Sequence, residues 1–202
     1  MKKATNFLMT VMFLLAATLA IAILPTEQDA AIYEDTLRLH ILANSDNADD
    51  QELKYGIRDK LLAKYGKQLG SSNNPEDAKD NISALIPEIE RDVDLWIEDA
   101  GYDYESEVTL GVEWYDTREY DDFTLPKGYY TSLQVMLGEA EGKNWWCVMY
   151  PPLCLDIATE DAPRDDAVLG YTKEEYSLIT DRGYNVKFKL LEVLSEAFSK
   201  NG

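Results

Sequence analysis

Hydrophobic residues recur every three or four positions in the first half of the chain, which is the spacing of an amphipathic helix. Residues 49–69 carry Leu53, Ile57, Leu61 and Tyr65 at this spacing. A glycine follows and stops the pattern. The pattern therefore predicts a helix over residues 49–69.

A short strand is predicted immediately before that helix. Residues 37–43 (LRLHILA) are rich in branched side chains and are ended by the polar cluster NSDNADD. Asp46, Asp49 and Asp50 of this cluster would lie near the positive end of the helix, where carboxylates are stabilising. The cluster therefore predicts a helix cap. A calcium loop is the alternative, but Asp46, Asn47, Asp49 and Asp50 lack the DxDxDG spacing and the distal glutamate of such loops.

A second helix is predicted to begin at Asn74-Pro75-Glu76-Asp77, where a cap residue precedes a proline and two acids. Gly101 ends it. Because Pro87 lies inside its apolar stripe, we expect a kink or a break at that point. The stripe consists of Ala78, Ile82, Leu85, Ile86, Ile89, Val93, Trp96 and Ile97.

The period then changes from helical to alternating, which is typical of strands. In residues 107–115 (EVTLGVEWY) the apolar side chains fall on one face, as expected of a half-buried strand. Further strands are predicted at 129–137 (YYTSLQVML) and 144–150 (NWWCVMY), with turns at 126–128 and 138–143. The apolar face of the first strand is formed by Val108, Leu110, Val112 and Trp114.

The predicted order is strand, two helices, three strands and a terminal helix at about 186–199. Consecutive strands with short links should pair antiparallel, and the helices can cover one face of the sheet. The expected fold class is therefore α+β: a two-layer domain with an antiparallel sheet of about four strands and helices on one face. The single domain should span residues 37–202, with an acidic tether at 25–36.

The N-terminus reads as an export segment. Lys2 and Lys3 precede an uncharged run that extends to Leu24 and includes the small residues around Ala22. Residues 1–24 are therefore a signal peptide, cleaved after Ala22, or an N-terminal membrane anchor. The flanking charges place the rest of the chain outside the cytoplasm in both cases.

The chain is strongly acidic, with 38 acidic and 19 basic residues and a net charge of −19. This charge repels phosphate backbones and anionic lipid headgroups, so nucleic acid is not an expected partner. We expect contact with the membrane only through the N-terminal segment.

The two cysteines, Cys147 and Cys154, lie close together in WWCVMYPPLC. Outside the cytoplasm such a pair is expected to form a disulfide, and a turn near Pro151 would bring the two residues within bridging distance. Free, packed thiols are the alternative. A metal site would need more ligands, and the single histidine, His40, lies far away in the sequence.

Common catalytic motifs do not occur in the sequence: GxSxG, HExxH and a glycine-rich phosphate loop are absent. Cys147 with His40 could form a thiol nucleophile and its base. This pairing rests only on residue type, and His40 is otherwise read as a strand residue bonded to a neighbour or facing water. We expect no catalytic residue, cofactor or metal.

The segment from Gly138 to Asp156 is unusual in composition. Adjacent strand residues point to opposite faces, so Trp145 and Trp146 should flank the sheet, and one of them should look away from the core. Pro151-Pro152 would stiffen the following turn. A rigid aromatic surface of this kind anchors protein partners, although both rings could instead be packed under the terminal helix and loops.

Two strings in the chain resemble the stage II sporulation protein R family. They are residues 37–62, which include ILANSD, and residues 142–156 (GKNWWCVMYPPLCLD). Between them, residues 125–139 resemble the family's strand-turn-strand. The chain departs from the family at WYDTREY and at Ala140, where a glycine is usual.

The resemblance implies a signal of endospore formation. It would be exported from the forespore into the space between the forespore and mother-cell membranes. There it would activate a membrane-embedded aspartic protease of the mother cell, which processes the precursor of an early mother-cell sigma factor. The expected partner contacts are Asn144, Trp145, Trp146, Pro151, Pro152, Asn44, Ser45 and Asp46.

Two other functions stay open at this point. The first is an exported hydrolase that acts on cell wall or peptide through Cys147 or a carboxylate. The second is a passive structural protein of the septum, although the sequence contains no repeats that could build a lattice.

Overall fold

The computed structural model describes residues 2–23, 27–69, 72, 74–120, 123–152, 171 and 173–180. Within these residues the elements follow one another as helix, helix, strand, two helices, five strands and a helix. In chain order they are α1 (Lys2–Ile23), α2 (Glu27–Asp35), β1 (Leu37–Leu42), α3 (Ala48–Leu69), α4 (Pro75–Asp99), β2 (Ser106–Tyr115), β3 (Arg118–Glu119), β4 (Thr124–Leu125), β5 (Gly128–Leu137), β6 (Asn144–Tyr150) and α5 (Lys173–Thr180).

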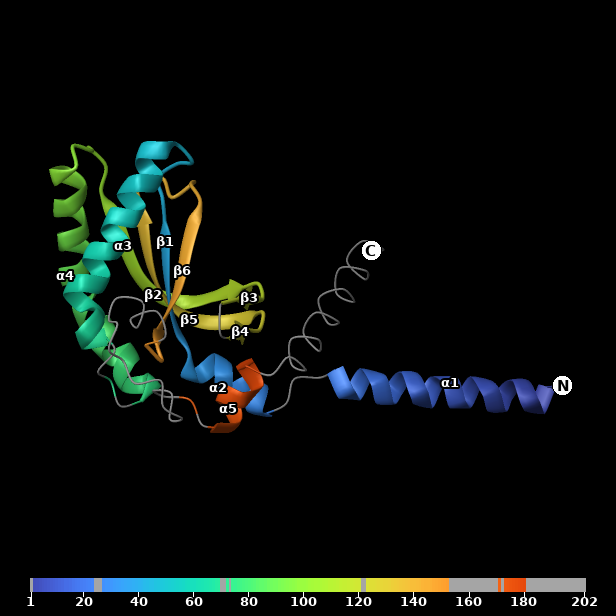
Figure 1. Cartoon of the computed structure of the whole chain (residues 1–202). Helices are drawn as coiled ribbons and strands as arrows, with labels where there is room; N and C mark the ends of the chain where they lie inside the picture. Colours follow the sequence, from blue (N-terminus) through green and yellow to red (C-terminus); the bar gives the residue numbers. More distant parts are fainter. Residues whose placement is uncertain are drawn as a thin grey trace.

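The main sheet has four strands in the order β2-β5-β1-β6 (Figure 1). β5 pairs antiparallel with β2, and β1 pairs antiparallel with β6. β1 and β5, however, run parallel, with Leu37 opposite Thr131. The α+β class with a sheet of four strands is confirmed, but the fully antiparallel pairing expected from the sequence is wrong. The short link between β5 and β6 joins two strands that β1 separates.

β1 lies in the interior of the main sheet and is its most completely buried strand. Leu37, Leu39 and Ile41 are almost fully inaccessible to solvent and lie on the face that α3 and α4 cover. α3 contributes Ile57 and Leu61 to the same core, and α4 contributes its apolar stripe. Alternation along β1 places Arg38 and His40 on the opposite face of the sheet.

The two long helices are joined through Asp92 of α4. The Lys64 ammonium and the Tyr65 hydroxyl of α3 both donate to its carboxylate. Burial acts to raise the pKa of Asp92, but these hydrogen bonds outweigh it and hold the pKa below its usual value. Burial, with Asp92 nearby, also raises the pKa of Tyr65 to about 12.

The predicted cap of α4 is present, since the backbone N–H of Asp77 donates to Asn74 Oδ1 over 2.8 Å. The helix continues through Pro87 as one element, so the break considered at this residue does not form. Burial of Leu85 and Ile89 on either side of the proline holds the two halves against the same sheet.

Residues 27–35 form α2, whereas the sequence suggested a tether at 25–36. Ile32 of this helix is fully buried, and the Tyr33 hydroxyl donates to the carbonyl of Lys127 over 3.1 Å. The buried hydroxyls of Thr36 and Tyr171 also bond to each other, which ties the end of α2 to the chain before α5. This segment therefore belongs to the folded domain.

The apolar side chains of α1 are mostly exposed: Phe7 and Phe13 are each 72% accessible. In the part of the chain that the structure describes, no helix is long and apolar enough to cross a membrane.

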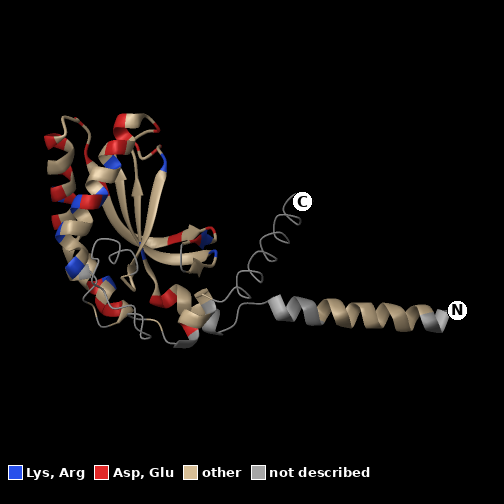
Figure 2. Cartoon of the chain, viewed as in Figure 1, with Lys and Arg blue, Asp and Glu red and all other residues tan. Residues whose placement is uncertain are grey.

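Figure 2 shows many Asp and Glu residues along α3 and α4. The helix predicted at 186–199 lies outside the described residues.

Candidate partner-binding site

The loop that follows β1 is organised by the buried carboxylate of Asp50. Asn44 Nδ2, Ser45 Oγ and Asn47 Nδ2 donate to one of its oxygens, at 2.9, 2.6 and 2.9 Å. The Tyr104 hydroxyl donates to the other oxygen at 3.0 Å. Burial acts to raise the pKa of Asp50, but the four hydrogen bonds outweigh it and hold the pKa below its usual value.

The predicted cap of the helix after this loop is also present. Asn47 Oδ1 accepts from the backbone N–H of Asp50 over 2.7 Å, and the Asn47 carbonyl accepts from Gln51. Asp49 and Asp50 lie in the first turn of α3, as expected. The polar cluster thus serves the helix end and the loop.

The same loop fixes the turn that carries the chain from β5 to β6. Asn44 Oδ1 accepts from the backbone N–H of Glu139 at 3.0 Å, and Asp46 Oδ1 accepts from that of Lys143 at 2.7 Å. The Gly142 N–H donates to the Ala43 carbonyl at 2.9 Å. A Cβ atom on Gly142 would lie 2.2 Å from the Ser45 carbonyl oxygen, so only glycine fits here. The ILANSD string therefore positions the first residues of β6.

The two tryptophans of β6 lie on opposite faces of the sheet, as predicted, and both are half-buried. Trp145 packs against the core on the helix side, with the Arg58 guanidinium 5.3 Å from its ring centre. Trp146 lies on the other face, where it stacks on His40 with ring centres 5.5 Å apart. The Arg118 guanidinium, from β3, lies 3.6 Å from the centre of the Trp146 ring.

His40 links three strands on this second face. Its Nδ1 lies 3.0 Å from Glu113 Oε2, and its Nε2 lies 3.1 Å from Asn144 Oδ1. The Tyr115 hydroxyl donates to the same Glu113 oxygen over 3.0 Å. His40 is 8% exposed, so the histidine is a nearly buried residue satisfied by its neighbours.

Next to His40, Arg38 is fully buried among tyrosine rings. Its guanidinium carbon lies 3.8 Å from the centre of the Tyr115 ring and 5.0 Å from that of Tyr130. Its Nη2 donates to the Tyr120 hydroxyl at 3.0 Å. Its Nε and Nη1 have no hydrogen-bond partner among the described residues.

The predicted contact residues differ in how far they reach solvent. Asn144 and Asp46 are exposed, whereas Asn44, Ser45 and the two tryptophans are half-buried. Pro151 and Pro152 are buried, and the Tyr150-Pro151 peptide bond is cis. The side chains of Asn44 and Ser45 are bonded within the chain, so their first role is to hold the loop.

The structure separates Cys147 from His40. Cys147 is fully buried, pairs with Leu39 in the strand register, and points to the helix side, whereas His40 lies on the opposite face. A thiol and base formed by these two residues is therefore ruled out. Cys147 is in a disulfide. Cys154, its predicted partner, lies outside the described residues, so this pairing stays a prediction.

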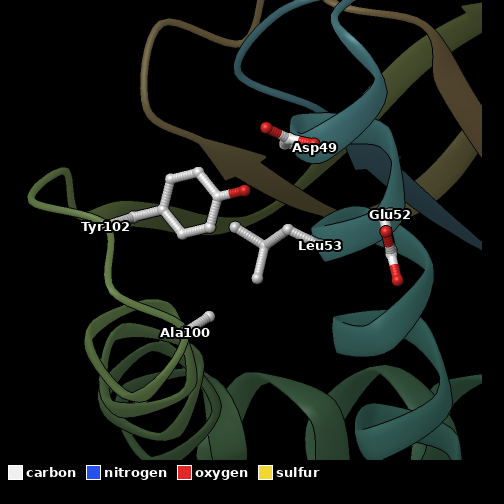
Figure 3. Close-up of a pocket in the computed structure, with 5 residues that line it drawn as sticks. All are labelled: Asp49, Glu52, Leu53, Ala100 and Tyr102. Carbon is white, nitrogen blue, oxygen red and sulfur yellow. The ribbon is translucent and has the colours of Figure 1, made fainter.

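A hollow of about 280 Å³ lies between the start of α3 and the end of α4 (Figure 3). Leu53, Ala100 and Tyr102 form its apolar part, and the carboxylates of Asp49 and Glu52 stand at its rim. Burial raises the pKa of Tyr102, with further contributions from Asp49, Asp50 and Glu52. Burial and these acids both keep the Tyr102 hydroxyl protonated.

Sequence reasoning missed the residues that surround His40 and Trp146. Glu113 and Tyr115 occupy the positions of β2 that alternate with its apolar face, and Arg118 lies in a strand of two residues. The only signal available was the alternation of Arg38 and His40 with apolar residues in β1, which marks a second, polar face of the sheet.

The chain thus folds into an α+β domain. On one face of its sheet, Trp146 packs against His40, His40 bonds to Asn144, and the polar loop after β1 holds the start of β6 in place. Residues 33–160 match the model of the family described as stage II sporulation protein R. The chain is 30% identical over 191 residues to stage II sporulation protein R of Bacillus subtilis (strain 168), with 85% of each chain covered. No solved structure matches. The chain belongs to the stage II sporulation protein R family and, as a member, has a role in sporulation.

Proposed function

We propose that the protein is the exported signal by which one cell of a sporulating pair instructs the other. The forespore would export it into the space between the forespore and mother-cell membranes. There it would bind and activate a membrane-embedded aspartic protease of the mother cell. The protease would then process the precursor of an early mother-cell sigma factor.

One observation carries the proposal: the two distinctive strings of the chain meet in one place. The loop after β1 bonds to the backbone of Glu139, Gly142 and Lys143 and so fixes where β6 begins. Asp46, which accepts from the Lys143 N–H, is exposed, and so is Asn144, the residue that follows Lys143. A surface this firmly held suits recognition by a partner, since little side-chain freedom is lost on binding.

Features of the N-terminus support export. α1 begins with two lysines, and the helix presents apolar side chains such as Phe7, Leu8 and Phe13 to solvent. A helix with this exposure fits a segment that is passed to the export machinery or held by a membrane.

We further propose that the protein acts by binding and not by catalysis. A ligand activates a receptor when it binds the active state more tightly than the inactive one. The hydrolase alternative would need Cys147 as a free nucleophile, and its burial, its disulfide and its separation from His40 argue against this.

The test is to reconstitute the three components. The full chain, the candidate protease and the sigma precursor are produced together in a host that does not sporulate, and cleavage of the precursor is followed by immunoblot. We expect cleavage only when all three are present. Cleavage without the protease would identify the chain as an enzyme, and no cleavage in the complete system would overturn the proposed activation.

A pair of tryptophan variants locates the surface. Trp146→Ala removes the ring that stacks on His40, and Trp96→Ala removes a half-buried ring from α4 on the far layer. Both lose stability through lost packing. We expect only Trp146→Ala to lower cleavage of the precursor, by about tenfold or more. Equal losses would mean that the effect reflects folding alone.

A further inference from the structure

β2 is an edge strand of the main sheet, and its outer side is only half covered. The Gly138 N–H donates to the Glu105 carbonyl at 3.0 Å, which sets the pattern of the β2–β5 ladder. In an antiparallel pair, backbone groups point alternately toward and away from the partner strand. The peptide groups of Glu107, Thr109, Gly111, Glu113 and Tyr115 therefore face β5. Those of Ser106, Val108, Leu110, Val112 and Trp114 face outward.

Helix α4 caps the first two of these outward groups. The Ser106 N–H donates to Asp94 Oδ1 at 2.7 Å, and the Val108 N–H donates to Glu90 Oε1 at 3.2 Å. No other described residue supplies an acceptor to the outward N–H groups of Leu110, Val112 and Trp114. Among the described residues, the edge is thus closed in its first half and open in its second half.

The open half of the edge is also apolar. Val112 is 68% exposed, Trp114 is 54% exposed, and Tyr129 across from it on β5 is 64% exposed. The Trp114 and Tyr129 rings pack edge to face with centres 5.0 Å apart. These three side chains share the face of the sheet on which α3 and α4 lie, but they extend beyond the helices' cover.

Edge strands are normally protected by lysine, proline or a covering element. β2 contains no lysine or proline. The charged residue within the open part, Glu113, points to the other face of the sheet, where it bonds to His40 and Tyr115. β-strand addition requires an exposed sheet edge, and the aromatic pair beside this edge offers a surface on which alternate side chains of the added strand can pack.

We propose that the β2 edge from Leu110 to Trp114 is a docking site for an extended segment of a partner protein, which adds as a fifth strand to the sheet. Every second side chain of that segment is apolar and packs on Val112, Trp114 and Tyr129. A basic residue lies toward its end near α4. The charge follows from Glu90, Asp94 and Glu107, which stand at the closed end of the edge.

A second copy of the chain is a poorer occupant. The chain carries a net charge of −19, and two copies joined along β2 would bring these acids together. β2 and β6 lie at opposite edges of the sheet, so this site is separate from the one around Trp146. The inference does not depend on the proposed function.

The test uses the full chain in detergent micelles and a fluorescent synthetic peptide of ten residues, in which valine alternates with lysine and threonine. Binding is followed by anisotropy, and amide protection is followed by hydrogen exchange. We expect the peptide to slow exchange at Leu110, Val112 and Trp114. A second peptide, N-methylated on the edge that would face β2, keeps its charge but cannot form the ladder. It should bind at least about tenfold more weakly.

Two variants and a control complete the test. Val112→Pro removes an outward N–H and leaves the bonds to β5 intact, and Val112→Lys places a charge on the edge. Both should weaken peptide binding by about tenfold or more, whereas Leu95→Lys on the exposed side of α4 should not change it. Equal binding of the N-methylated peptide would overturn the proposal. So would self-association of the chain that Val112→Lys abolishes.

Discussion

Asp50 is the residue on which the loop after β1 depends, because four side chains donate to its buried carboxylate. In Asp50→Asn one carboxylate oxygen becomes an amide nitrogen, so at least one of the four donors faces an N–H group, and the negative charge that strengthens the other hydrogen bonds is lost. We expect the free energy of unfolding to fall by about 2–3 kcal/mol. Urea denaturation at neutral pH measures this. Asp49→Asn, one residue earlier and exposed, is the control and should change stability by less than about 0.5 kcal/mol.

The same carboxylate gives stability a dependence on pH. The pKa of Asp50 in the folded chain lies below the value of about 3.9 expected when unfolded, and that of Asp92 is also lowered. The unfolded chain therefore binds protons first as pH falls. The stabilisation is complete above the unfolded pKa and is lost as pH falls through the folded one. Unfolding measured from about pH 6 to pH 2 should show a shallower decline for Asp50→Asn. Parallel curves would contradict this assignment.

Arg38 makes a different kind of contribution at the residue scale. It is fully buried, and its Nε and Nη1 lack partners among the described residues, so its charge is poorly compensated despite the Tyr115 and Tyr130 rings. Arg38→Met keeps most of the volume and removes the charge, and we expect the free energy of unfolding to rise by about 1 kcal/mol. Arg38→Ala leaves a cavity and should lower it by about 2–3 kcal/mol. Thermal melts measure the stability of both variants. Equal losses of stability in the two would show that the charge of Arg38 itself is stabilising.

At the scale of elements, local patterns predicted most of the fold. The period of four in α3, the cap of α4 and the alternation in β2 and β6 each identified an element to within one or two residues at its start. The order of the strands in the sheet could not be predicted from such local patterns. β1 lies between β5 and β6 because the turn at 138–143 passes over its end and bonds to Ala43 and Asn44. Such a pairing depends on contacts between distant residues.

Short or polar elements escaped prediction for a related reason. α2 has few apolar residues, and its helix is secured by the burial of Ile32 and by Tyr33. β3 and β4 have two residues each, which is too few for any period. The site residues divide in the same way, into those that a local pattern predicted and those that it did not. Alternation predicted that Trp145 and Trp146 flank the sheet, whereas Glu113 and Arg118 reach His40 and Trp146 from elements far along the chain.

Two substitutions in the turn between β5 and β6 should change the free energy of unfolding in opposite directions. Ala140 has a φ of 53°, in the left-handed region that favours glycine, so the alanine is strained at the position where the resemblance led us to expect a glycine. Ala140→Gly should raise the free energy of unfolding by about 0.5–1 kcal/mol. Gly142→Ala would place Cβ 2.2 Å from the Ser45 carbonyl oxygen and should lower it by about 2–4 kcal/mol.

Denaturant unfolding of these two variants provides its own control, because each substitution exchanges glycine and alanine in the same turn. If the turn only linked two strands, both effects would be within about 0.5 kcal/mol of zero. Opposite signs would confirm that the loop after β1 and this turn form one rigid unit. That unit determines where Asn144, a proposed partner contact, lies.

At the scale of the whole molecule, the cysteines distinguish a binding protein from an enzyme. If Cys147 and Cys154 are joined, removing either one has the same consequence, since each variant loses the whole crosslink. We expect Cys147→Ser and Cys154→Ser each to lower the free energy of unfolding by about 2–4 kcal/mol and to reduce precursor cleavage equally. A nucleophile would give a different result, because only Cys147→Ser would then abolish activity while Cys154→Ser kept it.

The double variant Cys147→Ser/Cys154→Ser sharpens this comparison. A shared disulfide is already lost in either single variant, so the second substitution should add little, and the three free energies of unfolding should agree within about 0.5 kcal/mol. Independent thiols would instead give losses that add. Because Cys147 is fully buried beside the core of β1 and β6, its crosslink would hold the chain that follows β6 against the sheet. Such a crosslink forms only in an oxidising compartment, so additivity in the exported protein would count against the disulfide and weaken the case for export.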